Sequence, residues 1–524
     1  MFSGLRCIPW VKLQICKKME NVRMDFEENI HQYDKKKEFY KFLPENGLKP
    51  EDIIREAELY EEMGEYSFYK GRASGVVYAD YNEEHRRLLQ KIFDICAYSN
   101  ASYPELFPGC RKMEAEIVRI ACSLYHGGVG SCGTVTSGGT ESIILACLAY
   151  RNRAYSCGIH RPEIVIPVTA HAAYDKAAQL LQMRIRHVAV DKNQRVDIGA
   201  MKRAINRETC MLVASAPNFA TGTVDNIEAI SEVCVSRFVL SQRYGVPLHV
   251  DACFGGFILP FMEFCDYPVP PFDFRVPAVT SISCDTSKYG FSPKGASLIL
   301  YREINFLHYQ YFCYSDWPGG IYATPTLEGS RNGCGIALTW ATLLYYGRHK
   351  YTELTHSIIE ATFAVRKGIE EIGHFKLVGD SDTTIIAFTS EAFNIYALSD
   401  RMCKHGWHLT NIQRPAAVHI CITLNHTKPG VIDEFLRDLA VSAEELINNP
   451  ELSQESRTAA IYEMASTTPD KSLIEEVSRL YLDCCYAIPQ PAIYNRTLSV
   501  EGRKMSMMGI HPTISNSHFP TLLS

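Results

Sequence analysis

The strongest signal in the chain is the run Ser283-Cys284-Asp285-Thr286-Ser287-Lys288-Tyr289-Gly290. It follows residues 279–282, an apolar and β-branched run typical of a buried strand, so Lys288 is predicted to lie just beyond the end of a strand. A second lysine, Lys294, follows six residues later and also precedes a glycine. One lysine near a strand end is a weak signal, because most lysines are solvated loop residues. Its meaning depends on two segments that lie upstream.

The first upstream segment is Thr136-Ser137-Gly138-Gly139-Thr140-Glu141-Ser142, which opens a helix with an apolar face. Glycines let a phosphate approach the backbone, and the free N–H groups at a helix start favour an anion. A plain helix cap is the alternative, since short glycine motifs match freely. The second segment, residues 247–252, is an apolar strand that ends in Asp251. By itself Asp251 fits a strand-end cap, an ion-pair partner or a metal ligand as well as a cofactor contact.

The order of the three segments is more specific than any one of them. A phosphate site, then a strand-end acid, then a strand-end lysine is the order used by enzymes that depend on pyridoxal 5'-phosphate. That cofactor needs an amine for its Schiff base and an acid for its ring nitrogen. We therefore expect this cofactor and no metal. His171, which opens another helix, either stacks on the cofactor or caps the helix, and without further context the cap is favoured.

Composition narrows the class of protein. Of 524 residues, 46% are hydrophobic and 21% are charged, which is ordinary for a soluble enzyme of two or three domains. The net charge of −6 argues against a nucleic-acid binder. The 19 cysteines are scattered through apolar runs without metal-site spacing, so we expect buried reduced thiols and a cytosolic environment. The apolar cluster at residues 8–11 is too short to cross a bilayer, and we expect no transmembrane helix.

The pattern along the chain predicts an α/β fold with a mostly parallel sheet. Between residues 88 and 302, helical runs alternate with short apolar runs that read as buried strands, at residues 164–166, 187–190, 211–214, 248–250 and 298–300. We expect four parts: an N-terminal helical arm (1–80), a large cofactor-binding α/β domain (81–345), a smaller C-terminal α/β domain (346–487) and a disordered tail (488–524). In such folds ligands bind at the carboxyl ends of the strands, where Asp251 and Lys288 are predicted to lie.

These residues resemble the fold-type I pyridoxal-phosphate enzymes and, within them, the sphingosine-1-phosphate lyase family. The resemblance covers about residues 37–486 and rests on the segments already quoted. It also rests on residues 71–75 with Tyr78, residues 107–109 with 111–116, and residues 319–325 with 329–331. It implies the fold-type I architecture with a large sheet domain and a smaller C-terminal domain. It also implies cleavage of a phosphorylated long-chain base to a fatty aldehyde and phosphoethanolamine.

The resemblance also implies roles for individual residues. Lys288 would be the Schiff-base lysine and Asp251 the partner of the ring nitrogen. The other cofactor contacts would be Gly138, Gly139, Thr140, His171, Ser287, Gly320 and Ser330. Tyr78, Asn100, Tyr103 and Lys294 would approach the substrate phosphate. The loop at residues 319–331 would complete the site of a neighbouring subunit, so a homodimer with shared active sites is expected.

The chain departs from the family pattern at three positions. Ser287, Tyr103 and Thr221 each stand where the family usually has histidine, which puts rate and substrate preference in doubt. Two rival hypotheses therefore stay open: a pyridoxal-phosphate amino-acid decarboxylase, and a catalytically weak paralogue that binds lipid phosphates. Eukaryotic members carry a membrane-spanning segment that we do not find. The resemblance implies the cytosolic face of the endoplasmic reticulum membrane, with surface association or a cytoplasmic location as the alternatives.

Overall fold

The structure is a computed structural model that describes residues 9–34, 39–64, 66–236, 245–454, 456–467 and 471–488. The chain divides into two compact units, each described by itself: Met1–Gly64 with Thr468–Ser524, and Glu65–Thr467. The tail expected to be disordered lies, from residue 489 onward, outside the described residues.

The smaller unit is helical. Helices α2 (Pro9–His31) and α17 (Lys471–Tyr486) pack against each other, with the rings of Phe26 and Tyr481 in an edge-on contact at 5.4 Å. Helix α3 (Pro50–Glu61) begins at a proline, which suits the first helical position because the proline nitrogen has no hydrogen to donate. None of the residues of α3 is buried.

The larger unit is built on a seven-stranded sheet with the order β1-β7-β6-β5-β4-β2-β3. The strands are β1 (Cys132–Thr136), β2 (Glu163–Pro167), β3 (Arg184–Val188), β4 (Thr209–Ser215), β5 (Leu248–Asp251), β6 (Val279–Cys284) and β7 (Ser297–Tyr301). Strand β7 runs antiparallel to both of its neighbours, β1 and β6. All the other neighbouring strands of this sheet pair in parallel. The predicted mostly parallel sheet is confirmed.

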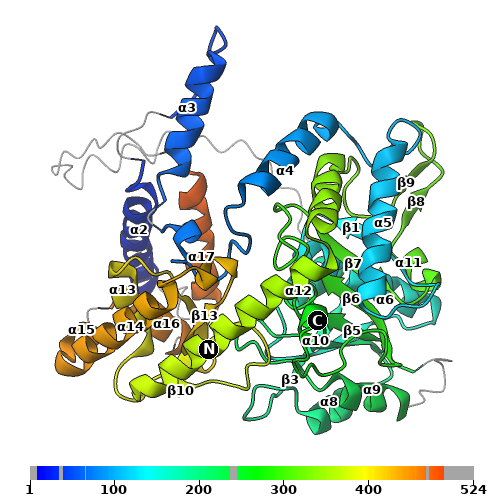
Figure 1. The fold of residues 1–524 in the computed structure, drawn as a ribbon. Helices are drawn as coiled ribbons and strands as arrows, with labels where there is room; N and C mark the ends of the chain where they lie inside the picture. The colour runs from blue at the N-terminus through cyan, green and yellow to red at the C-terminus, as the bar shows by residue number, and fades with distance from the viewer. Residues whose placement is uncertain are drawn as a thin grey trace. The chain divides into compact units, whose positions relative to one another are not determined.

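Helices cover both faces of this sheet (Figure 1). On β7, Leu298 and Leu300 belong to one apolar core while Ile299 belongs to another, as the alternation of a strand requires. The second core is completed by α6 (Gly139–Ser156), α7 (Ala173–Leu181) and α11 (Ile304–His308). The first is covered by α5 (Pro108–Leu124), α8 (Ile198–Ala204), α9 (Ile227–Ser236), α10 (Leu259–Glu263) and α12 (Gly333–Ile372). Each fully buried aliphatic side chain contributes about 1.5–3 kcal/mol, so the two cores hold the strand ends in place.

Helix α12 is 40 residues long and is interrupted at Gly347, whose backbone angles are φ 57° and ψ 172°. A residue with a Cβ atom is strained at such a positive φ, and glycine is not. Helix α4 (Glu83–Cys96) packs on α12.

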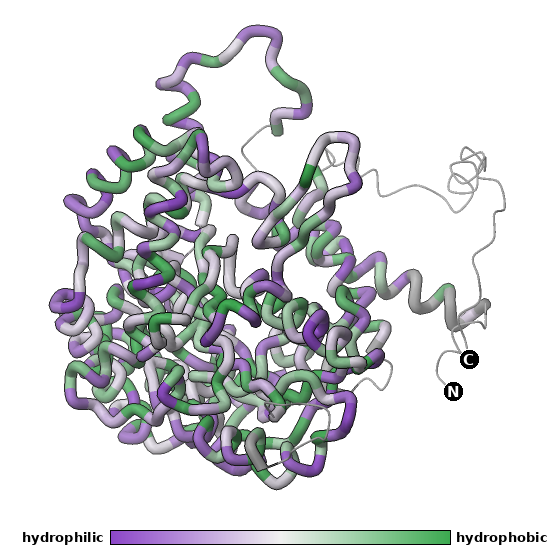
Figure 2. Tube along the Cα trace, turned by 90° about the vertical axis from the view of Figure 1, so that its right-hand side faces the viewer, coloured by the Kyte–Doolittle hydropathy of each residue, from purple (hydrophilic) through white to green (hydrophobic). Residues whose placement is uncertain are grey.

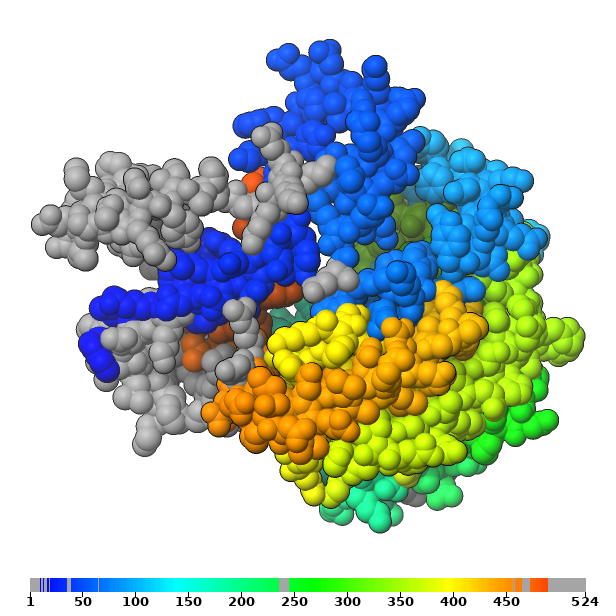
Figure 3. Space-filling model, turned by 60° about the vertical axis from the view of Figure 1, so that its left-hand side comes forward, coloured from blue at the N-terminus to red at the C-terminus, as the bar shows by residue number. Residues whose placement is uncertain are grey.

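A second, antiparallel sheet follows, with the order β10-β11-β13-β12. Its strands are β10 (Lys376–Leu377), β11 (Ile385–Thr389), β12 (Thr410–Gln413) and β13 (Ala416–Cys421). Helix α13 (Ile395–Lys404) packs on this sheet. Helices α14 (Val431–Asn448) and α16 (Arg457–Thr467) pack on α13, and α15 (Glu451–Gln454) links them. Helices α12 and α14 lie side by side, yellow-green and orange in Figure 3. The predicted boundary at residue 345 stays a prediction; Gly347 lies close to it.

The remaining elements are short: η1 (Phe68–Lys70), η2 (Leu424–Thr427) and a hairpin of β8 (Phe312–Tyr314) and β9 (Tyr322–Thr324). Most helices carry both hydrophobic and hydrophilic residues, as Figure 2 shows, which fits helices that cover a sheet with one face. Among the described residues, no helix has the length and apolar character needed to cross a membrane.

Candidate active site

Lys288 lies just beyond the end of β6, as predicted, and its side chain is 24% exposed. Its Nζ atom is 3.0 Å from Oδ2 of Asp285 and 5.4 Å from the centre of the Phe254 ring. Burial lowers the pKa of Lys288, but Asp285, with smaller contributions from Cys253 and Asp251, outweighs burial and raises that pKa above its ordinary value. The amine therefore sits in an enclosed, acidic environment at the carboxyl edge of the sheet, where ligands of such folds bind.

Asp285 also touches the turn that opens α6. A Cβ atom at Gly139 would lie 2.8 and 2.9 Å from the two carboxylate oxygens of Asp285 and 3.0 Å from the sulfur of Cys253. A larger residue at Gly139 would displace these groups. The glycine turn and the lysine are thus brought together through Asp285.

The start of α6 is open for an anion. Gly138 caps the helix without a side-chain hydrogen bond, and a Cβ atom there would meet nothing within 4 Å. Among the described residues, no hydrogen bond occupies the N–H groups of Gly139 and Thr140. The carboxylate of Glu141, in the same turn, accepts hydrogen bonds from the N–H and the hydroxyl of Ser137, both at 2.7 Å. Free N–H groups at the start of a long helix, with room in front of them, form a suitable phosphate site.

Asp251 ends β5 and is buried, 7% exposed. Its Oδ1 accepts hydrogen bonds from the Cys253 N–H at 3.1 Å and from the Ser283 hydroxyl at 3.3 Å. On the same strand, His249 contacts Ser281 at 2.7 Å, and burial lowers its pKa to about 4. A neutral histidine and two serines therefore support the strand end that presents the Asp251 carboxylate.

Three buried rings form a wall beside the lysine. The ring centres of Tyr78 and Tyr289 are 4.9 Å apart, and Phe254 lies 6.0 Å from Tyr78 and 5.6 Å from Tyr289. Burial raises the pKa of both tyrosines well above the ordinary value, so their hydroxyls are neutral at physiological pH. The Tyr289 hydroxyl is held by the Ile422 carbonyl at 2.7 Å.

Lys294 also lies against this wall, with Nζ 5.3 Å from the centre of the Tyr78 ring and 3.5 Å from the Ser287 carbonyl. Desolvation of the amine, followed by repulsion from Lys288, lowers the pKa of Lys294. Of the expected substrate residues, Tyr78 and Lys294 are therefore next to the lysine. Ser287, which directly precedes Lys288 in the sequence, is half-buried.

Asn100, Tyr103 and Ser330 form a second group, one loop away. The Asn100 side chain accepts hydrogen bonds at 3.0 Å from the N–H groups of Ser102 and Arg331. The N–H of Tyr103 donates to the Asn100 carbonyl at 3.2 Å, and the Tyr103 ring is 53% exposed. This group meets the phosphate site indirectly, through the Leu327 N–H, which donates to Glu141 at 3.1 Å. Asn100 is used here to hold the loop at residues 329–332.

His171 and Gly320 are exposed, and no contact among the described residues joins them to Lys288. The Nδ1 atom of His171 accepts from the Ala173 N–H at 3.1 Å, which is the helix-capping interpretation considered from the sequence. Gly320 lies in the β8–β9 hairpin with φ +110°. Their cofactor roles stay predictions.

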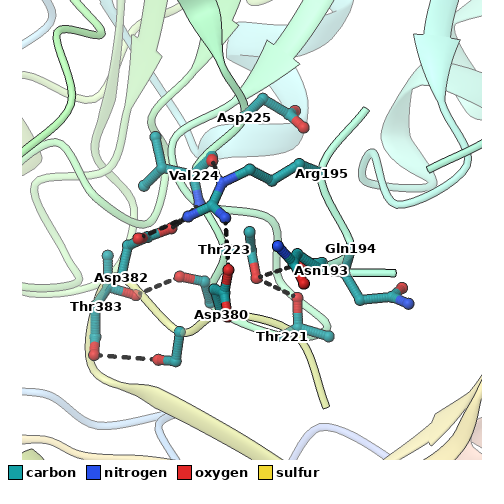
Figure 4. Close-up of polar contacts among 12 residues, drawn as sticks. Asn193, Gln194, Arg195, Thr221, Thr223, Val224, Asp225, Asp380, Asp382 and Thr383 are labelled. Carbon is teal, nitrogen blue, oxygen red and sulfur yellow. Dashed lines mark hydrogen bonds and ion pairs between the residues drawn. The ribbon is translucent and has the colours of Figure 1, made fainter. Parts of the chain in front are cut away.

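A polar joint holds the loop after β4, which neighbours Asp251, against the small sheet (Figure 4). Arg195 donates to the Val224 carbonyl at 3.0 Å and pairs with Asp380 and Asp382. Thr221 lies in this joint, and its hydroxyl donates to Asn218 at 3.0 Å.

The residues fit pyridoxal phosphate. The open glycine turn suits its phosphate, the buried Asp251 suits its ring nitrogen, and the enclosed Lys288 amine suits its carbonyl carbon. Oδ1 of Asp285 is buried and has no hydrogen-bond partner among the described residues, so a polar group is missing beside this turn. The sequence analysis did not assign Asp285 or Phe254. An acid three residues before the lysine at a strand end was the signal for the first, and nothing in the pattern singled out the second.

Comparison with known proteins identifies the family. Residues 99–391 match the pyridoxal-dependent decarboxylase conserved domain. The chain is 42% identical over 491 residues to sphingosine-1-phosphate lyase of Drosophila melanogaster, covering 93% of this chain and 88% of that protein. It is 43% identical over 489 residues to sphingosine-1-phosphate lyase 1 of Mus musculus, covering 93% and 84%.

Solved structures agree. The sphingosine-1-phosphate lyase of Burkholderia pseudomallei superposes with a TM-score of 0.76 and 36% identity, over 83% of this chain and 99% of that one. A glutamate decarboxylase of Lactobacillus brevis shares the fold, with a TM-score of 0.67 and 21% identity over 79% and 97%. The chain therefore belongs to the sphingosine-1-phosphate lyase family of pyridoxal-phosphate-dependent enzymes.

Proposed function

We propose that this protein is a lyase that cleaves phosphorylated sphingoid bases between carbons 2 and 3, giving a fatty aldehyde and phosphoethanolamine in sphingolipid catabolism. The observation that carries the proposal is the enclosed Lys288 amine at the end of β6, beside the open start of α6 and near the buried Asp251. The similarity to named lyases over more than nine-tenths of the chain supports the substrate class.

The chain's own residues divide the work. When bound, pyridoxal phosphate supplies a conjugated ring that accepts the electron pair released from the broken bond. Lys288 would provide the amine that holds the cofactor. Asp251 would hold a proton on the ring nitrogen, and the N–H groups of Gly139 and Thr140 would receive the phosphate. The group that removes the proton of the carbon-3 hydroxyl would be Lys288 or a nearby tyrosine.

The substrate phosphate is assigned to the side of the aromatic wall that carries Lys294. An ammonium is a strong phosphate partner, and this one lies against Tyr78. Ser287 and Tyr103 contribute hydroxyl groups where the family usually contributes histidine, so both give hydrogen bonds without a positive charge. Lys294 would therefore supply more of the positive charge that binds the substrate phosphate than the equivalent lysine does in a family member that has those histidines.

A homodimer with shared active sites is part of the proposal. The β8–β9 hairpin presents apolar side chains to solvent, among them Phe312 at 54%, Trp317 at 52% and Ile321 at 84% exposure. Gly320 lies in this hairpin, and Ser330 lies in the loop that follows. A second copy that covers the hairpin would bury these side chains and bring Gly320 toward its site.

For location we propose attachment to the cytosolic face of the endoplasmic reticulum membrane, because phosphorylated long-chain bases are membrane lipids. Fractionation of cells that express the full chain tests this, with recovery in the membrane pellet expected. Recovery only in the supernatant would place the enzyme in the cytoplasm.

A substrate panel tests the reaction. The purified protein, supplied with pyridoxal phosphate, is offered sphingosine 1-phosphate, free sphingosine and a set of amino acids. We expect fatty aldehyde and phosphoethanolamine in equal amounts from the first only. Release of carbon dioxide from an amino acid would favour a decarboxylase, and binding of the lipid phosphate without aldehyde would favour a weak paralogue.

A further inference from the structure

Asp285 is the carboxylate in direct contact with the Lys288 amine. Its Oδ2 lies 3.0 Å from Nζ, and its side chain is 9% exposed. The two residues are three apart on the turn after β6, and the Asp285 carbonyl also accepts the Lys288 N–H at 3.5 Å. A buried pair of this kind holds a flexible lysine in one direction, since the carboxylate has few alternative partners.

The rest of the Asp285 carboxylate is poorly supported. Oδ1 is buried and has no hydrogen-bond partner among the described residues. Asp251 differs, because its Oδ1 accepts two hydrogen bonds from Cys253 and Ser283. Of the two acids, Asp285 is therefore the one whose carboxylate is engaged with the Lys288 amine, while the Asp251 carboxylate is engaged with the backbone and hydroxyl donors beside it.

We propose that Asp285 is a positioning residue: its carboxylate holds the Lys288 amine in one direction, beside the start of α6, from which that amine reaches a carbonyl carbon. The inference rests on the proposed function for its carbonyl partner.

Other titratable groups face the same amine. They are Cys253 and Asp251 from the β5 side, Lys294 from the following loop and Cys421 from β13. Burial raises the pKa of Cys253 and Cys421, the latter to about 12, so both thiols are neutral at neutral pH. Lys294 is a second amine. This leaves Asp285 and Asp251 as the candidate carboxylate partners of Lys288, which a comparison of two isosteric variants separates.

The experiment measures the titration of Lys288 itself. The full-length protein, freed of cofactor with hydroxylamine, is labelled with trace acetic anhydride across a pH series, and labelling of each lysine is read by peptide mass spectrometry. In Asp285→Asn we expect the Lys288 midpoint to fall by about one pH unit or more, which gives about ten times more neutral amine at a fixed pH below the midpoint. Asp251→Asn should move it less. The exposed Lys376 serves as the reference lysine.

A second variant keeps the test informative if Asp285→Asn does not fold. In Gly139→Ala the new methyl group would push on the Asp285 carboxylate, and we expect the Lys288 midpoint to fall as well. An unchanged midpoint in Asp285→Asn, or a larger shift in Asp251→Asn, would overturn the proposal. The result does not depend on turnover: a protein that cleaves no lipid phosphate fails the proposed function, while the labelling still decides whether Asp285 partners Lys288.

Discussion

Nη2 of Arg195 donates to both carboxylate oxygens of Asp382, at 2.9 and 2.8 Å. The same carboxylate accepts the Val224 N–H at 2.8 Å, so one acid joins the loop after β4 to the loop before β11. Both side chains are partly shielded, at 24% and 21% exposure. The loop after β4 also neighbours the active strand end, because the Ala216 N–H donates to the Asp251 carbonyl at 2.8 Å.

We expect Asp382→Asn to lower the free energy of unfolding by about 2 kcal/mol, because it removes the more buried of the two carboxylates that pair with the Arg195 guanidinium. Urea denaturation measures the change. Lys367→Gln is the matched control: it breaks the exposed pair with Glu371 and should cost less than about 0.5 kcal/mol. Equal effects of the two variants would show that the joint contributes no more than a surface ion pair.

Stability should fall as pH drops from about 6.5 toward 4. Burial lowers the pKa of His249, His419 and His426 to about 4, so the unfolded chain binds protons in this range while the folded chain does not. The stabilising contribution is complete above the unfolded pKa and is lost as pH falls through the folded one. Denaturation at a series of pH values should show a shallower slope for His249→Gln, and an unchanged slope would contradict the assignment.

The sequence predicted the central sheet because its strands β2, β4, β5 and β7 are continuous apolar runs, which is the signature of strands buried on both faces. It misplaced the edge strand β3, where Arg184 and Arg186 interrupt the run. These arginines pair with the buried Glu163 on β2, an interaction that no local pattern announces. The edge strand β1 was missed since Gly133 lies within it; a Cβ there would meet the Ile299 carbonyl at 2.2 Å.

The site was predictable where it follows strand and helix ends. Lys288, Asp251 and the Gly138-Gly139 turn are fixed by the order of elements, and the structure groups them. The Asp285 pairing was not predicted, because it depends on how the turn after β6 folds back toward α6. The supporting role of Asn100 likewise depends on a loop more than 200 residues away in sequence, at Arg331.

Asp251→Asn should reduce turnover by orders of magnitude with much of the cofactor retained. The change removes the charge that holds a proton on the ring nitrogen and leaves the shape nearly unaltered. Turnover and cofactor content are measured on the same preparation. Near-normal turnover would mean that the ring nitrogen has another partner or none.

Lys294→Ala should weaken the phosphorylated substrate about tenfold to a hundredfold, because a charge-assisted bond to phosphate is worth about 1.5–3 kcal/mol. Binding of free sphingosine should change much less. Competition assays with both ligands measure the difference. Equal losses of affinity for the two ligands would show that Lys294 does not bind the substrate phosphate.

Tyr103→His tests the departure from the family pattern. It restores the usual residue in an exposed loop and should raise the cleavage rate if the missing charge limits the enzyme. Steady-state kinetics with sphingosine 1-phosphate give the answer. A rate that stays the same would remove Tyr103 from the substrate-phosphate end.

The central claim, that Lys288 carries a lyase reaction, is tested most directly by aldehyde release from sphingosine 1-phosphate with wild-type protein and Lys288→Ala. The account predicts that wild-type protein shows the visible absorbance of the linked cofactor and releases aldehyde, and that Lys288→Ala loses both while keeping its fold. Aldehyde release at the wild-type rate by Lys288→Ala, or cofactor absorbance unchanged by that substitution, would contradict it.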